Sequence, residues 1–256
     1  MPASLHLTNG LLFAFLLVLA RVAGVFARVP LPGMRAAPEP ARAALAVGVT
    51  LALFARWPSI DATGFGPGRL AAWALGEAAT GLAIGVAVAV VLEVFPLAAQ
   101  ILGLQAGYAY ASTIDPNTQA DSGILLVLAQ LAAGLMFFAA GGDREVVRWL
   151  AASLDQAPPG TFAYSAASAP ALIGLAARMF AVGLRLALPV VALLVMVDLS
   201  LALLGRLSAQ LQLLSLAFPV KMLVGLAMLA ASAVVWPRLL REMSAAAWQV
   251  LRRLPG

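Results

Sequence analysis

The residues that could do chemistry are few in this chain, and most of them lie among apolar residues. Glu77, Glu93 and Asp198 are carboxylates within apolar runs, where they could carry protons or ions if those runs cross a membrane. His6 is the only histidine, and the chain has no cysteine. Disulfides and thiolate metal sites are therefore excluded, and histidine-based metal or triad chemistry has almost no suitable residues.

The same inventory disfavours an enzyme. An intramembrane protease needs a nucleophile with its base, or two aspartates within helices, and Asp198 has no aspartate partner in an apolar run. The chain also has no Gly-Lys phosphate-binding motif, so energy for any transport should come from other components. We expect no catalytic residue, no metal site and no cofactor.

Composition places the chain in a membrane. Hydrophobic residues make up 63% of it and charged residues 11%, and its mean hydropathy is +0.98. A soluble domain has about a quarter charged residues. The formal net charge of +5 more often reports membrane topology than nucleic-acid binding, and the basic residues are scattered. The prediction is an all-α integral membrane protein that contacts lipid and no nucleic acid.

The apolar residues divide into several helical segments, separated by loops rich in proline and glycine. The third predicted helix meets Pro96, and a short apolar piece, 97–107, follows it. Asp143 is the predicted N-cap of an amphipathic helix that buries Val146, Val147, Leu150 and Leu154, and the tail 237–256 forms a second amphipathic helix. The predicted membrane helices cover residues 10–29, 41–57, 70–94, 123–142, 171–206 and 213–236.

Several charges lie too deep in these helices for a simple bundle in lipid. Arg21 lies inside the first helix, and only fifteen uncharged residues separate Glu77 from Glu93. A charge at the bilayer centre costs about 2.5–3.5 kcal/mol on insertion scales. The expected buried or inter-subunit charges are Glu77, Arg178, Arg185, Asp198, Arg206 and Lys221, with Asp198 paired to an arginine such as Arg206 or one on a neighbouring subunit.

The distribution of basic residues also conflicts with six simple crossings. The basic loop 28–42 and the basic tail 238–253 should both be cytoplasmic, yet six crossings place them on opposite sides. Either the number of crossings is odd or some helices never cross. Both conflicts indicate a subunit whose helices pack against other subunits.

Small and kinking residues support close helix packing. Gly81 and Gly85 form a G-x-x-x-G pattern, which lets two helix backbones approach closely, although ordinary packing within one chain explains it equally well. Pro189 and Pro219 lie inside predicted helices, where each removes a backbone hydrogen bond. Pro219 follows Phe218 and precedes Lys221, the only lysine, so a simple kink with an outward lysine is an alternative there.

The segment "YAYASTIDPNTQADSG", residues 108–123, separates two apolar helices. It has two tyrosines and a turn signal at Asp115–Pro116. Irregular backbone cannot stay in hydrocarbon unless protein or a cavity surrounds it. A surface loop with tyrosines in the interfacial belt is the simpler alternative.

Three stretches of this chain resemble the FliR family, called SctT in injectisomes. They are "QAGYAYASTIDP" (105–116), "APPGTF" (157–162) and the block 186–229, which contains "FPVK" followed by "LVGL". The resemblance implies a type III export-gate subunit of the bacterial inner membrane that assembles with FliP-like, FliQ-like, FlhB-like and FlhA-like subunits and passes unfolded proteins. The last block is more similar to the flagellar branch than to the injectisome branch.

The resemblance also implies an organisation and a plug. It implies one domain over 1–256, with a FliP-like part over about 1–170 and a FliQ-like helical hairpin with an amphipathic tail over about 171–256. The loop at about 105–122 would project into the central channel and help to close it. Its implied pore residues are Tyr108, Tyr110, Ser112, Thr113, Ile114, Asp115 and Pro116.

Two alternatives remain beside a flagellar gate. The first is the virulence injectisome, which uses the same family. The second is a small transporter or proton channel that uses the intramembrane carboxylates, which we disfavour because the chain lacks paired broken helices in matching halves.

Overall fold

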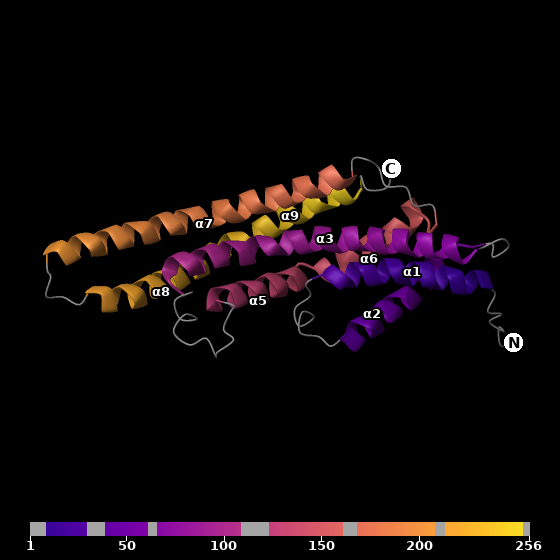
Figure 1. Ribbon diagram of the computed structural model, residues 1–256, viewed down its shortest axis with the longest axis horizontal. Helices are drawn as coiled ribbons and strands as arrows, with labels where there is room; N and C mark the ends of the chain where they lie inside the picture. Colours follow the sequence, from indigo (N-terminus) through magenta and orange to yellow (C-terminus); the bar gives the residue numbers. More distant parts are fainter. Residues whose placement is uncertain are drawn as a thin grey trace. The chain divides into compact units, whose positions relative to one another are not determined.

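Every regular element that the structure describes is helical (Figure 1), which confirms the all-α prediction. The computed structural model describes residues 9–29, 39–60, 66–108, 123–160, 168–207 and 213–252. The α-helices are α1 (Asn9–Arg28), α2 (Glu39–Ala52), α3 (Pro67–Ala106), α5 (Ile124–Ala139), α6 (Gly142–Gln156), α7 (Ser168–Leu207), α8 (Leu213–Ser232) and α9 (Trp236–Leu251), with short 3-10 helices η1 (Phe54–Arg56) and η2 (Ala233–Val235).

Among the residues that the structure describes, four helical segments are long and apolar enough to cross a membrane, or five if α5 and α6 together form one bent span. The protein is therefore a multi-pass membrane protein. The four segments are Gly10–Arg28, Pro67–Ala106, Ser168–Arg206 and Pro219–Leu251. Helix α2 has 14 residues, fewer than the roughly 20 that a spanning helix needs.

Helix α3 continues through Pro96 for 40 residues, so the predicted break there is wrong. A proline inside a helix costs about 3 kcal/mol because it removes a hydrogen bond and crowds the preceding turn. The residues around Pro96 are nevertheless tightly packed, since Val94 and Phe95 are fully buried and Ala98 and Ala99 almost fully so. This packing outweighs the local cost.

The chain forms two compact units, each assembled from distant parts of the sequence. The first contains 1–90, 138–175 and 245–256, and the second contains 91–137 and 176–244. In the first unit α1 packs against α2. The buried residues of α1 recur every three or four positions, as in Leu17, Val18, Val22 and Val25. That spacing gives α1 one apolar face.

The second unit packs α7, α8 and the beginning of α9 against the later half of α3. The rings of Phe95 and Trp236 stack with centroids 4.7 Å apart. Gly183 of α7 lies so close to α3 that an added Cβ would be 2.9 Å from the Leu97 side chain. Helix α5 contributes a stripe with a four-residue period, namely Leu125, Ala129, Ala133 and Phe137, all buried.

The two predicted amphipathic helices are present as α6 and α9. In α6, Val146, Leu150 and Leu154 are buried as expected, whereas Val147 is exposed. The N-cap of α6 is Gly141, so the prediction of Asp143 as the cap is wrong. Asp143 lies in the first turn instead, where its negative charge still favours the positive end of the helix dipole.

Candidate functional site

Helix α3 ends at the point where the predicted plug segment begins. The Tyr108 amide donates to the Gly103 carbonyl over 3.0 Å, and the Gly107 amide donates to the Leu104 carbonyl over 3.3 Å. Gly107 has a φ of 87°, which glycine adopts without strain. These bonds form a Schellman motif, which stops the helix and fixes the direction in which the chain leaves it.

The side chain of Tyr108 is held against α8. Its hydroxyl donates a 2.8 Å hydrogen bond to the Met222 carbonyl. Partial burial raises the pKa of Tyr108 above its usual value of 10.0, so the hydroxyl stays protonated and able to donate near neutral pH. Gly225 permits this approach, because an added Cβ would lie 2.9 Å from the Ala106 Cβ. The first residue of the predicted plug is therefore an anchor between α3 and α8.

A polar cluster lies beside this anchor, among α3, α7 and α8. The Lys221 Nζ lies 2.8 Å from Asp198 Oδ1 and 2.9 Å from Oδ2. Gln105 Nε2 also donates to Asp198 Oδ2, over 3.4 Å. The Lys221 side chain is 15% exposed and that of Asp198 43%. Asp198 thus pairs with Lys221 rather than with Arg206, which corrects the predicted partner.

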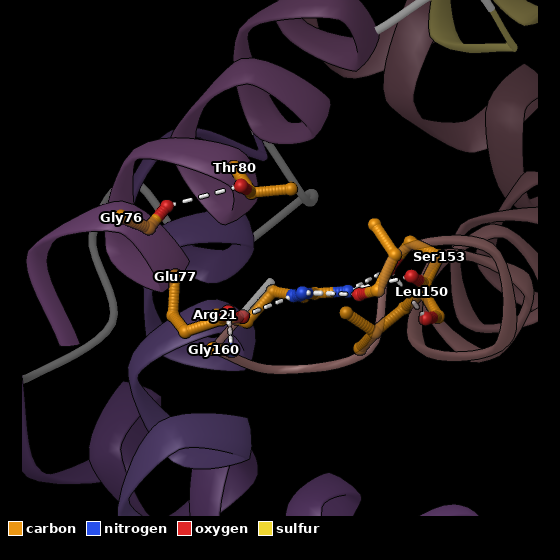
Figure 2. A network of polar contacts seen from close by, with 8 residues as sticks. Arg21, Gly76, Glu77, Thr80, Leu150, Ser153 and Gly160 are labelled. Atoms are coloured by element: carbon orange, nitrogen blue, oxygen red, sulfur yellow. Dashed lines mark hydrogen bonds and ion pairs between the residues drawn. The ribbon is translucent and has the colours of Figure 1, made fainter. Parts of the chain in front are cut away.

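A second cluster, in the other unit, surrounds a fully buried arginine (Figure 2). Arg21 Nε donates to Glu77 Oε2 over 2.6 Å, and the two side chains are 1% and 0% exposed. The remaining nitrogens of the guanidinium reach α6: Nη1 donates to the Ser153 carbonyl over 2.6 Å and to its hydroxyl over 3.2 Å. Nη2 donates to the Ala157 carbonyl over 2.8 Å.

The cluster also holds the "APPG" turn that follows α6. The Gly160 amide donates to Glu77 Oε1 over 3.1 Å. Gly160 has a φ of 91°, and an added Cβ would lie 2.6 Å from the Trp73 ring. Both the backbone conformation and the aromatic contact require glycine. The buried Arg21–Glu77 ion pair and the turn 157–160 therefore join α1, α3 and α6. The sequence singled out this turn only by its resemblance to the family.

The remaining predicted residues are not brought into either cluster. Arg178, Arg185 and Arg206 are exposed on α7, as is Pro189, which lies inside that helix. Phe218 and Pro219 lie inside α8. Tyr110, Ser112, Thr113, Ile114, Asp115 and Pro116 lie outside the described residues. Their role as a plug stays a prediction, as does the division of the chain at about residue 170.

The sequence did not indicate how Arg21 is sheltered. Its position inside an apolar helix indicates that its charge needs a partner. Two of its acceptors are the backbone carbonyl groups of Ser153 and Ala157, and the type of a residue does not show that its backbone will accept such a bond. Among the described residues, no three histidine, cysteine, aspartate or glutamate side chains form a group that could hold a metal ion. The two clusters are suited to hold helices together.

Comparison with known proteins matches residues 12–247 to the family described as bacterial export proteins, family 1. The chain is similar to the flagellar biosynthetic protein FliR of Escherichia coli strain K12, with 28% identity over 214 residues, which cover 83% of this chain and 81% of the relative. It is also similar to FliR of Bacillus subtilis strain 168, with 28% identity over 228 residues and 84% of each chain covered. The family match includes residues of both compact units.

Proposed function

The chain belongs to the bacterial export proteins, family 1, and from this premise we propose that it is a structural, pore-forming subunit of the flagellar type III protein export gate. The family match over residues 12–247 carries the proposal. The FliR relatives are named for flagellar biosynthesis, which favours the flagellum over the injectisome. The proposed location is the bacterial inner membrane, and the proposed role is structural rather than enzymatic.

The charges of α7 support assembly with partner subunits. A helix of 40 residues is about 60 Å long, twice the thickness of the hydrocarbon core. A membrane-length window of about 20 residues, wherever it is placed along α7, includes at least one of Arg178, Arg185 and Asp198. The two arginines are exposed, so protein or water must face them.

The apolar surface of α7 also lacks cover from its own chain. In its most apolar window 17% of the residues are buried inside the chain, against 67% for α3. The exposed residues include Phe180, Leu188 and Met196. A helix that presents both large apolar side chains and arginines fits the interior of a multi-subunit wall better than lipid alone. We therefore propose FliP-like, FliQ-like, FlhB-like and FlhA-like partners, and unfolded flagellar proteins as cargo.

A transporter or proton channel has less support. Glu77 is paired with Arg21, and Asp198 with Lys221. Both carboxylates are therefore engaged in ion pairs that join two helices.

Affinity purification tests the assembly. The tagged full-length chain, extracted from its own membrane in mild detergent, should bring down FliP-like and FliQ-like subunits in a fixed ratio. Removal of the gene should abolish motility, and the wild-type chain should restore it. Arg178→Leu/Arg185→Leu should weaken partner recovery, whereas the conservative Arg178→Lys/Arg185→Lys should retain it. Normal motility without the gene, or a chain purified alone at full yield, would contradict the proposal.

The plug is tested on the same assembly. Within this proposed gate, Tyr108 anchors the segment to α8, and the bulk of Tyr108 and Tyr110 would narrow the lumen without adding charge. Deletion of 108–114 should raise ion conductance through the gate in planar bilayers. Ser112→Ala, which removes little bulk, is the matched control and should keep the wild-type conductance. Unchanged conductance after the deletion would contradict the plug and would indicate that the segment is a surface loop.

A further inference from the structure

A cleft in the first compact unit, between α6 and the C-terminal end of α9, has the character of an anion site. Its volume is about 430 Å³, within the usual range for small-molecule pockets. Two arginines and a tryptophan supply most of its polar and aromatic character. The lining residues are Arg148, Trp149, Ala152, Gln156 and Arg252.

Aromatic stacking holds this cleft in shape. The rings of Trp149 on α6 and Trp248 on α9 are nearly parallel, with an angle of 4° and centroids 4.5 Å apart. The Arg252 guanidinium lies 5.8 Å from the centre of the Trp149 ring, within the range of a cation–π contact. Helix α6 thus contributes Arg148 and Trp149 to this region, Trp248 lies on α9, and Arg252 directly follows α9. The Trp149 ring lies against the Arg252 guanidinium.

The positive charge of the cleft is available to a ligand. Arg148 has an exposed side chain, and Glu145 lies 3.7 Å from its Nη1 atom on the same helix. Exposed pairs at this spacing are weak and screened by salt, and Glu145 does not line the cleft. Arg252 is also exposed. Two guanidinium groups can present planar donors to phosphate oxygens.

Both helices lie next to apolar segments in the sequence. Two residues separate α6 from the apolar helix α5, and α9 forms the last part of the candidate span Pro219–Leu251. Amphipathic helices with arginine and tryptophan at such positions lie in the headgroup region of a bilayer. The phosphate that is most abundant there is that of the lipid headgroup.

We propose that this cleft binds the phosphodiester headgroup of an anionic phospholipid, with Arg148 and Arg252 on the phosphate oxygens. Gln156 can donate to a headgroup hydroxyl, and Trp149 packs against the glycerol backbone. An acidic peptide is less suited, because the cleft combines a small volume with a position beside membrane-length helices. The proposal rests on the membrane helices and this cleft, and does not depend on the export-gate role.

Native mass spectrometry of the full-length chain in detergent tests the site. The protein, with any co-purifying subunits, is delipidated and titrated with phosphatidylglycerol or with phosphatidylcholine. We expect tighter binding of phosphatidylglycerol than of phosphatidylcholine. Arg148→Gln/Arg252→Gln should weaken phosphatidylglycerol binding about thirtyfold, because each basic residue near an anionic membrane surface strengthens binding about fivefold. Both arginines are exposed, so the variant should fold normally.

The matched control is Arg144→Gln/Arg241→Gln. It removes two exposed arginines from the same two helices, outside the cleft, and should keep the wild-type preference. Equal losses in both double variants would show attraction by net charge alone and would overturn the site. So would equal binding of the two lipids, displacement of phosphatidylglycerol by millimolar inorganic phosphate, or tighter binding of an acidic peptide than of phosphatidylglycerol.

Discussion

Arg21→Met should lower the free energy of unfolding by about 3–5 kcal/mol, because it leaves the Glu77 carboxylate buried without its partner. Both side chains are almost completely inaccessible. Arg21 also donates to the carbonyl groups of Ser153 and Ala157, which lose their donors in the variant. Unfilled acceptors in a buried site add to the loss.

Unfolding of purified variants in detergent micelles measures this effect. Arg28→Met is the matched control, since Arg28 lies seven residues along α1, carries the same charge and is exposed. It should change stability by less than about 0.5 kcal/mol. Arg21→Met/Glu77→Met should recover part of the loss, because no charge remains buried. Equal stability of the Arg21 and Arg28 variants would show that the ion pair does not hold the unit together.

Gly81→Ala should destabilise the first unit by about 3 kcal/mol, the upper end for overpacking a close contact. An added Cβ would overlap the Arg21 carbonyl oxygen and lie 2.8 Å from the Arg21 carbonyl carbon. Gly85 has the same constraint, with an added Cβ at 2.6 Å from the Val25 carbonyl oxygen. Backbone atoms cannot rotate away as side chains can, so the two helices must separate. That separation also strains the Arg21–Glu77 bond.

Gly48→Ala is the control for this substitution. Gly48 lies inside α2 of the same unit, and an added Cβ meets no atom within 4 Å. Alanine there should leave stability unchanged or raise it by about 0.5–1 kcal/mol, since glycine weakens a helix interior. Both variants can be compared by the same detergent unfolding measurement. A Gly81→Ala protein as stable as the Gly48→Ala protein would show that α1 and α3 are not in close contact.

The membrane class and most helices could be predicted from the sequence, because hydropathy and the spacing of apolar residues are local properties of the chain. The failures occur where tertiary contacts outweigh a local signal. Pro96 breaks a helix by its own chemistry, yet the burial of Phe95 and its neighbours keeps α3 continuous. Asp143 is a good cap by residue type, yet the N-cap of α6 is Gly141, two residues earlier. The burial that keeps α3 continuous is not encoded within the few residues around Pro96, whereas the left-handed Gly141 before α6 is a local feature.

The candidate sites were predicted less completely. The sequence predicted charges that are either buried or between subunits, without showing which of the two applies to each residue. Glu77 is buried in a pair with Arg21 of the same chain, whereas Arg178, Arg185 and Arg206 are exposed and their contact with other subunits stays a prediction. Asp198 forms its ion pair with Lys221, which is 23 residues away in the sequence, because α7 and α8 lie side by side in the second unit. Spacing along one helix cannot show such a partner. The plug segment, identified by resemblance, remains a prediction.

The sequence separation within the Arg21 cluster has a consequence for biosynthesis. Arg21 and Glu77 leave the ribosome well before Ser153 and Ala157, whose carbonyl groups are 132 and 136 positions from Arg21. About 80 residues separate Glu77 from Ala157, which is roughly 4–16 s of translation at typical bacterial rates. During that interval the Arg21 guanidinium lacks the two carbonyl groups that accept from it in the folded chain. We therefore expect a chain truncated before Ser153 to be degraded faster in cells than the full-length chain, because its Arg21 side chain lacks these two acceptors.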